Sequence, residues 1–103
     1  MKIIKCLSEY INEELHDAEK YADKALMVKQ EYPEVADLMY QLSLEEMTHM
    51  QRLHVEVEKL ITNYRNQKGE PPEAMLAVYN YLHEQAISKA KEVKILQGMY
   101  REQ

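Results

Sequence analysis

The chain has 103 residues, 30% of them charged, and a formal net charge of −5; acidic and basic residues are interleaved along it, without the basic stripe that a nucleic-acid-binding surface requires. Two glycines and three prolines are too few for the turns of a β-sandwich or small barrel, where glycine supplies positive φ and proline a preset φ. The composition therefore predicts one all-α domain, residues 1–103, built from a few long helices.

Two corners divide the chain into three expected helices. The first expected helix, over about residues 2–30, ends before Tyr32-Pro33, because proline disfavours the helical conformation in the residue before it and favours the first position of a new helix. The second expected helix spans about 33–67 and ends at segment 68–72, which contains a glycine and two prolines. The third spans about 72–100.

Apolar residues recur at helical spacing in each segment. The first helix has one stripe: Ile4, Leu7, Ile11, Leu15, Ala18, Ala22 and Ala25. The second has a stripe of Val35, Met39, Leu42, Leu53, Val57 and Leu60, and a second stripe on its reverse side of Ala36, Tyr40, Leu44, Met47, Met50 and Ile61. The third has Met75, Tyr79, Leu82, Ala86, Ala90, Val93 and Leu96. A helix with two apolar sides is usually buried on both, so we expect a homodimer or higher homo-oligomer.

Three polar residues interrupt these stripes, where a charged side chain needs a partner or a metal. Glu14 lies near the stripe of the first helix, and Glu46 and His49, three residues apart, lie near that of the second. Residues equally far from the first corner face each other across a helical hairpin. Glu14 is therefore expected opposite His49, with Glu46 one turn away.

The three residues are half of a two-metal donor set. Di-iron carboxylate sites in four-helix bundles take one Glu from each of two helices and a Glu-x-x-His pair from each of the other two. A two-fold dimer of this chain would supply that set. Carboxylates with imidazoles suit iron (Fe²⁺/Fe³⁺), and also manganese. We expect Glu14, Glu46 and His49 to be the metal ligands and the catalytic residues.

The sequence offers further, weaker candidates for site residues. Tyr21, two turns from Glu14, could bond a ligand or relay an electron, or serve as an ordinary core tyrosine. His83 is expected near the level of Glu56, where a second metal site or an additional ligand is conceivable beside the simpler role of a paired interior histidine. A second Glu-x-x-His, Glu13 to His16, faces away from the stripe and is interpreted as surface.

The hairpin residues resemble those of the ferritin-like superfamily. They are Glu13-Glu14-Leu15 with Tyr21 and Ala25, followed by Leu44-Glu45-Glu46-Met47-Thr48-His49. The similarity covers roughly residues 8–60 and is closest to short encapsulated ferritins and more distant to rubrerythrins, in which a Glu of the first helix is likewise followed seven residues later by Tyr. It implies a metal site at a dimer interface with ferroxidase or related oxygen and peroxide chemistry. The four-cysteine module of rubrerythrins has no counterpart here, since Cys6 is the single cysteine.

The expected function is thus a di-iron or di-manganese protein with ferroxidase or oxygen- or peroxide-reducing activity. The alternative is a non-enzymatic helical assembly protein with a structural or vestigial metal site. Expected partners are metal ions and further copies of the chain, but neither nucleic acid nor a membrane, because no apolar run approaches the ~18 residues of a span. One unpaired cysteine suits a reducing, cytoplasmic setting.

Overall fold

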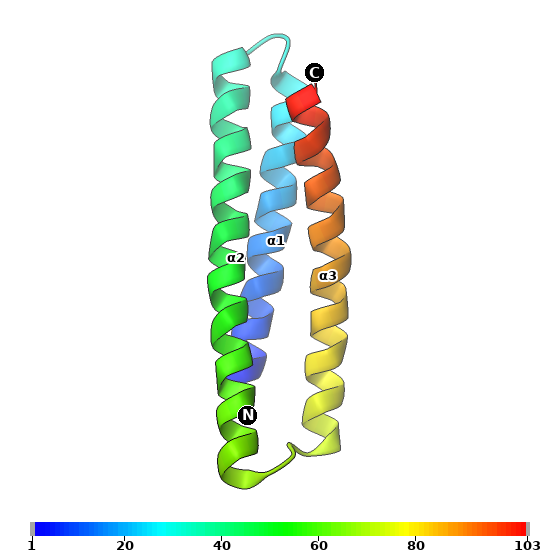
Figure 1. Cartoon of the computed structure of the whole chain (residues 1–103). Coiled ribbons are helices and arrows are strands. Elements are labelled where there is room, and N and C mark those ends of the chain that lie inside the picture. The colour runs from blue at the N-terminus through cyan, green and yellow to red at the C-terminus, as the bar shows by residue number, and fades with distance from the viewer. Residues whose placement is uncertain (1, 103) are drawn as a thin grey trace.

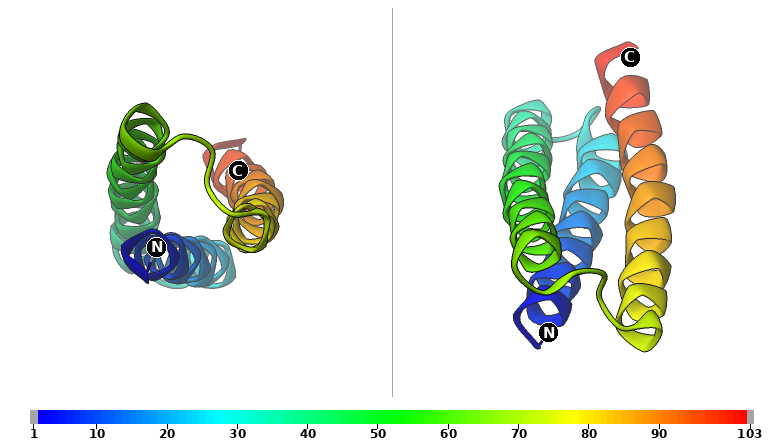
Figure 2. Two further views of the ribbon diagram at one scale, coloured as in Figure 1. Left: turned by 90° about the horizontal axis from the view of Figure 1, so that it is seen from below. Right: turned by 60° about the horizontal axis from the view of Figure 1, so that its bottom comes forward.

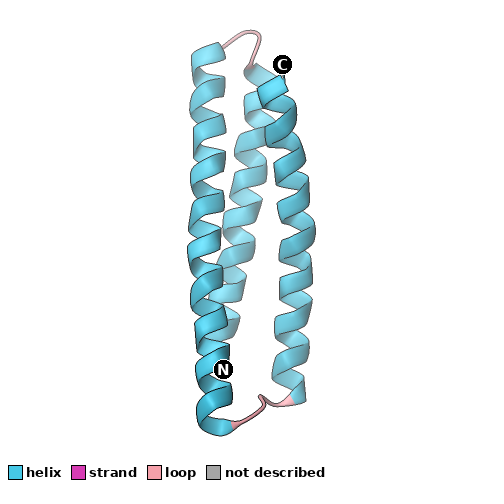
Figure 3. Ribbon diagram, viewed as in Figure 1, coloured by secondary structure: helices cyan, strands magenta, loops and turns pink. Residues whose placement is uncertain are grey.

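The computed structural model describes residues 2–102, which form three helices, α1 (Lys2–Val28), α2 (Pro33–Lys68) and α3 (Glu73–Glu102) (Figures 1 and 3). Within this range there is no strand, so the predicted all-α class with three helices is confirmed, and the helix ends differ from the expected ones by only one or two residues. The molecule is a rod with extents of 56 × 19 × 18 Å and a radius of gyration of 16.4 Å. A compact chain of this length has a radius of about 13 Å.

Backbone hydrogen bonds explain where the helices end. The first corner is closed by the Tyr32 N–H, which donates to the carbonyl of Val28 over 2.7 Å, and α2 then starts at Pro33. At the second corner Gly69 adopts a φ of +84°, which a residue with a side chain rarely adopts. Pro72 precedes α3, and its carbonyl accepts bonds from the amides of Met75 and Leu76.

α1 is the central element of the three. It packs along both α2 and α3, whereas α2 and α3 barely touch each other. The view along the helices in Figure 2 shows α1 beside both neighbours, and the 69–72 connection crossing the wider separation from α2 to α3. The alanines of α1, Ala18, Ala22 and Ala25, are fully buried and let neighbouring helices approach closely. None of the three helices described within residues 2–102 has an apolar stretch long enough to cross a membrane.

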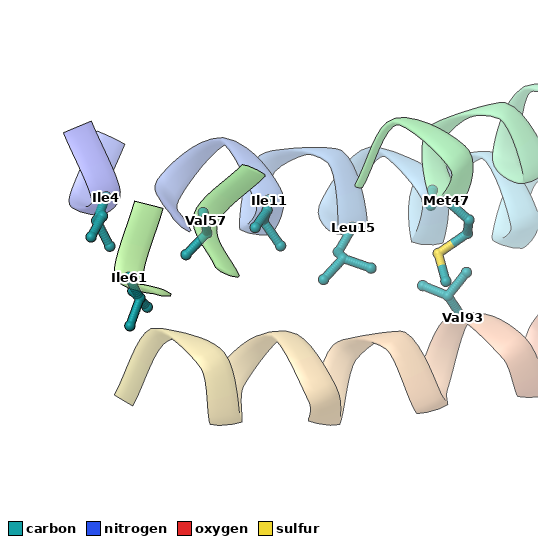
Figure 4. Packing of buried hydrophobic residues seen from close by; sticks show 8 residues of the cluster. Ile4, Ile11, Leu15, Met47, Val57, Ile61 and Val93 are labelled. Atoms are coloured by element: carbon teal, nitrogen blue, oxygen red, sulfur yellow. The ribbon is translucent and has the colours of Figure 1, made fainter. Parts of the chain in front are cut away.

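The main core lies along the α1–α2 contact. Its largest fully buried side chains include Leu15 of α1, Val57 of α2 and Val93 of α3 (Figure 4). The buried residues of α1 match the expected stripe, except that Leu7 is only partly buried and Ser8 is buried.

The buried face of α2 differs from the expected one. Its buried residues are Ala36, Ser43, Met47, Val57 and Ile61, which belong mostly to the reverse stripe. Of the stripe that was expected to form the core, only Val57 is buried, and Val35 is 44% exposed. Both sides of α2 are apolar, so hydrophobicity alone does not distinguish them. The structure selects the side that meets both α1 and the C-terminal part of α3.

Burial on α3 is confined to its C-terminal third. Its buried residues are Val93, Gln97 and Tyr100. The amide of Gln97 donates to the Ser43 hydroxyl over 2.9 Å, and that hydroxyl donates to the carbonyl of Ala18 over 2.7 Å, so one buried polar chain joins the three helices. The preceding part of α3, residues 73–92, contributes only partly buried or exposed side chains.

Candidate metal centre

The structure brings Glu14, Glu46 and His49 together across the α1–α2 contact. One ligand-type atom of each lies within 4.8 Å of the others, and among residues 2–102 this is the one group of three or more acidic, histidine or cysteine side chains with that geometry. Glu46 and His49 project together because they are three residues apart on α2. α1 supplies Glu14 at the same height.

The imidazole of His49 lies between the two carboxylates. Its Nδ1 is 3.4 Å from Oε2 of Glu14 and 3.6 Å from Oε1 of Glu46. These distances exceed the 2.7–2.9 Å of a tight charge-assisted hydrogen bond. The three side chains therefore surround a common point without being locked to one another.

The site lies at the surface of the α1–α2 pair. The side chains of Glu46, Glu14 and His49 are 18%, 27% and 51% exposed. Glu14 and His49 border an open pocket of about 580 Å³ with Arg52, Leu53, Val55 and Glu56. No described residue of α3 lines it, so the pocket opens on a side of the hairpin that α3 does not cover.

The two carboxyl groups are too close for both to be ionised without cost. The pKa of Glu46 is raised to about 7, first by a hydrogen bond with Glu14, then by burial and by the negative charge of Glu14, while His49 lowers it and Asp17 raises it. Oε2 of Glu14 is buried and has no hydrogen-bond donor. An ionised carboxylate only accepts hydrogen bonds, so Glu14 and Glu46 can bond each other only when one of them is protonated.

A metal ion fits this donor set. The buried oxygen of Glu14 needs a cationic or protic partner, and a divalent metal would compete with a proton for Glu46. Two hard carboxylates with one imidazole match the preferences of iron and manganese. The side chains present are thus compatible with a metal, and the identity of that metal stays a prediction from the sequence.

The weaker sequence candidates, Tyr21, His83 and Glu56, are not part of the group of three. Tyr21 is partly buried on α1, and no hydrogen bond within residues 2–102 joins it to the three ligands. Glu56 borders the same pocket as Glu14 and His49 (the metal pocket of the proposal below) but is paired with Lys59 at 3.3 Å. The ring of His83 stacks on that of His54, two residues before Glu56 along α2, with centroids 5.3 Å apart, and it lines a different pocket from Glu56.

The second Glu-x-x-His, Glu13 with His16, is exposed, as expected. Arg52 is a neighbour of the site that sequence reasoning missed. It follows His49 by one helical turn and supplies positive charge to the pocket rim. The i, i+3 spacing that connects Glu46 to His49 would also have identified it.

Comparisons with known proteins give no relative, since no family model, no curated protein and no solved structure matches the chain. The likeness to ferritin-like hairpins thus stays a prediction from residues 8–60. The case for a metal rests on the geometry of Glu14, Glu46 and His49.

Proposed function

We propose that this chain is a di-iron or di-manganese carboxylate protein that oxidises Fe²⁺ or reduces oxygen or peroxide, with its site completed by a second copy. The observation that carries this proposal is the convergence of the ligand atoms of Glu14, Glu46 and His49 within 4.8 Å, from two helices. The buried Glu14 oxygen without a donor supports it.

One chain offers too few ligands for two metals. Three side chains can anchor one ion with positions left open, whereas a two-metal carboxylate site takes about four carboxylates and two imidazoles. A two-fold axis beside the pocket would double two Glu and one His to that number.

Apolar residues around the site favour this arrangement. The α2 stripe that α1 and α3 leave partly uncovered includes Leu42, Leu53 and Leu60, which are half-buried, and Val35, which is 44% exposed. Leu53 also lines the metal pocket. Covering this stripe with the same stripe of a second copy would bury apolar surface, at roughly 25 cal/mol per Å², and would exclude water from the ligands.

In this proposal each ligand would have a distinct role. Glu46 would hold both metals through its carboxylate, Glu14 would be a further carboxylate ligand, shared or not, and His49 would hold one metal through a ring nitrogen. Bound iron or manganese would supply one-electron redox chemistry and open positions for oxygen or peroxide. Glu46, whose pKa is raised to about 7, would release its proton on binding a metal, because a carboxylate ligand must be deprotonated.

A structural or vestigial site is the competing function. It is favoured by the placement of His49, whose Nδ1 lies within 4 Å of both carboxylates. His49 at that position contacts both carboxyl groups without a metal, so the three side chains need no ion to lie together.

Metal analysis of the purified protein tests the site itself. We expect about one iron or manganese per chain, lost in Glu46→Ala and in His49→Ala. The chain offers a matched control in Glu13→Ala and His16→Ala, which change the same residue types in the same spacing at exposed positions. Metal retained by both site variants, or absent from the parent protein after loading with Fe²⁺ or Mn²⁺, would contradict the proposal.

Oxygen consumption after addition of Fe²⁺ then separates an enzyme from a structural site. A catalytic centre consumes oxygen with turnover, and Glu46→Ala abolishes this. A structural site binds metal without consuming oxygen beyond the rate of free Fe²⁺. Sedimentation at micromolar concentration completes the test, because a stable monomer with full activity would exclude a shared site.

A further inference from the structure

A second pocket lies on a different side of the bundle from the metal pocket. Its volume is about 200 Å³, and all three helices line it, with Ile11 from α1, Met50 and His54 from α2, and Leu82, His83 and Ala90 among those from α3. It shares no lining residue with the metal pocket. It lies beside the part of α3, residues 73–92, that buries no side chain completely, where the packing of α3 leaves room.

Aromatic rings form one wall of this pocket. The rings of Tyr79 and His83 stack with centroids 5.6 Å apart and an interplanar angle of 17°, and those of His83 and His54 stack at 5.3 Å and 11°. Three nearly parallel rings thus run in series from α3 to α2. A wall of this kind favours a flat ring that can stack offset or edge-on against it.

The two histidines of this wall differ in their partners. His54 is fixed by Glu58, whose Oε1 lies 2.5 Å from its Nε2. His83 makes no hydrogen bond or ion pair within residues 2–102, although it is half-buried. A neutral imidazole has one donor and one acceptor nitrogen, so His83 can bond a hydroxyl group of a ligand.

Charge restricts the ligand further. None of the described residues that line this pocket is Asp, Glu, Lys or Arg, in a chain of which 30% is charged. An ionised ligand would lose hydration there without gaining a counter-charge. A volume of about 200 Å³ also lies below the roughly 300–1,000 Å³ of pockets that hold drug-sized molecules.

From these properties we infer that this second pocket, which all three helices line, binds a small, neutral, planar aromatic alcohol of one or two fused rings. The ring lies among Ile11, Leu82 and Ala90 against the stacked wall, and its hydroxyl bonds the His83 imidazole. This inference is independent of the proposed metal chemistry, because the two pockets share no residue.

Binding of 2-naphthol to the full chain tests it. The chain has no Trp, so naphthol fluorescence is read without tryptophan background. We expect saturable binding at one site per chain. Ala90→Leu fills the pocket and should weaken binding at least about tenfold, since an overfilled site cannot accept the ring without displacement. The matched control is Ala77→Leu on the exposed side of the same helix, which should leave affinity within about twofold.

The hydroxyl contact is tested separately with His83→Phe, which keeps a stacking ring and removes the nitrogens. Its affinity for 2-naphthol should fall about fivefold, the equivalent of one hydrogen bond, while its affinity for naphthalene stays the same. Far-UV circular dichroism verifies folding of each variant, and Ala86→Leu provides a second filling substitution if Ala90→Leu does not fold.

Three outcomes would overturn the inference. The first is no saturable binding by the parent protein. The second is equal affinity in Ala90→Leu and Ala77→Leu. The third is that a helix of another copy covers the pocket. The parent protein would then fail to bind naphthol, and Ala90→Leu would have a smaller sedimentation coefficient than the parent protein. Glu46→Ala should bind naphthol normally, so failure of the metal proposal is distinguishable from failure of this one.

Discussion

Glu14 and Glu46 form a carboxyl pair across the α1–α2 contact, and a hydrogen bond with Glu14, burial and the negative charge of Glu14 raise the pKa of Glu46 to about 7. The ordinary value is 4.5, so between these two values the folded, metal-free protein binds more protons than the unfolded chain. Stability then falls with rising pH in this interval.

The first prediction is therefore a pH-dependent free energy of unfolding. Without metal, the contribution of Glu46 is present below about pH 4.5 and is lost as the pH rises through about 7, a decrease of at most about 3 kcal/mol. Urea denaturation in chelator at pH 4.5–8 measures it. Glu46→Gln should flatten this part of the curve, and Glu45→Gln, an exposed neighbour, should not. An unchanged fall of stability between pH 5 and 7 in the Glu46→Gln variant would contradict the assignment.

The second prediction concerns metal affinity. Because metal and proton compete for Glu46, the apparent dissociation constant for Mn²⁺ should fall about tenfold per pH unit as the pH rises toward 7, and more slowly above it. Isothermal titration with Mn²⁺, which avoids oxidation during the measurement, gives the slope and the number of protons released in buffers of different ionisation enthalpy. An affinity independent of pH between 5 and 7 would show that Glu46 is not a ligand.

The third prediction concerns the buried polar chain. Ser43→Ala leaves the Gln97 amide without its 2.9 Å acceptor inside the core, and should cost about 1–3 kcal/mol. Adding Gln97→Leu removes the unpaired amide, so the double variant should be more stable than Ser43→Ala alone. Urea denaturation of the four members of this cycle measures the coupling, and simple additivity would mean that the bond contributes nothing.

The fourth prediction concerns the end of α3. Tyr100 is 5% exposed, stacks on Tyr40 with centroids 4.6 Å apart, and donates its hydroxyl hydrogen bond to Asp37, while Lys29 donates to its carbonyl. Tyr100→Phe keeps the stack and should cost about 1 kcal/mol. Tyr100→Ala should cost about 3–5 kcal/mol, as for other buried aromatic side chains. Thermal unfolding gives both values; a larger loss in the Phe variant than in the Ala variant would contradict the packing.

Much of the fold could be predicted because its signals are local. Proline and glycine mark both corners, and the corner at Tyr32 sets the register that places Glu14 level with His49. The buried side of α2 could not be predicted in the same way, because both of its sides carry apolar residues, and Ser43 is buried only through partners on α1 and α3. The stack of His54 on His83 likewise depends on the position of α3, which no local pattern specifies.

Burial limited to the last third of α3 sets the order in which the molecule opens. Opening of residues 73–92 exposes no fully buried side chain of that segment, whereas detaching Val93, Gln97 and Tyr100 breaks the core and the polar chain. Amide hydrogens of the first two-thirds of α3 should therefore exchange through a low-energy, partial opening, and those of its last third only with global unfolding. Such an opening would separate the first two-thirds of α3 from the bundle without moving the carboxyl pair of Glu14 and Glu46, which lies on α1 and α2.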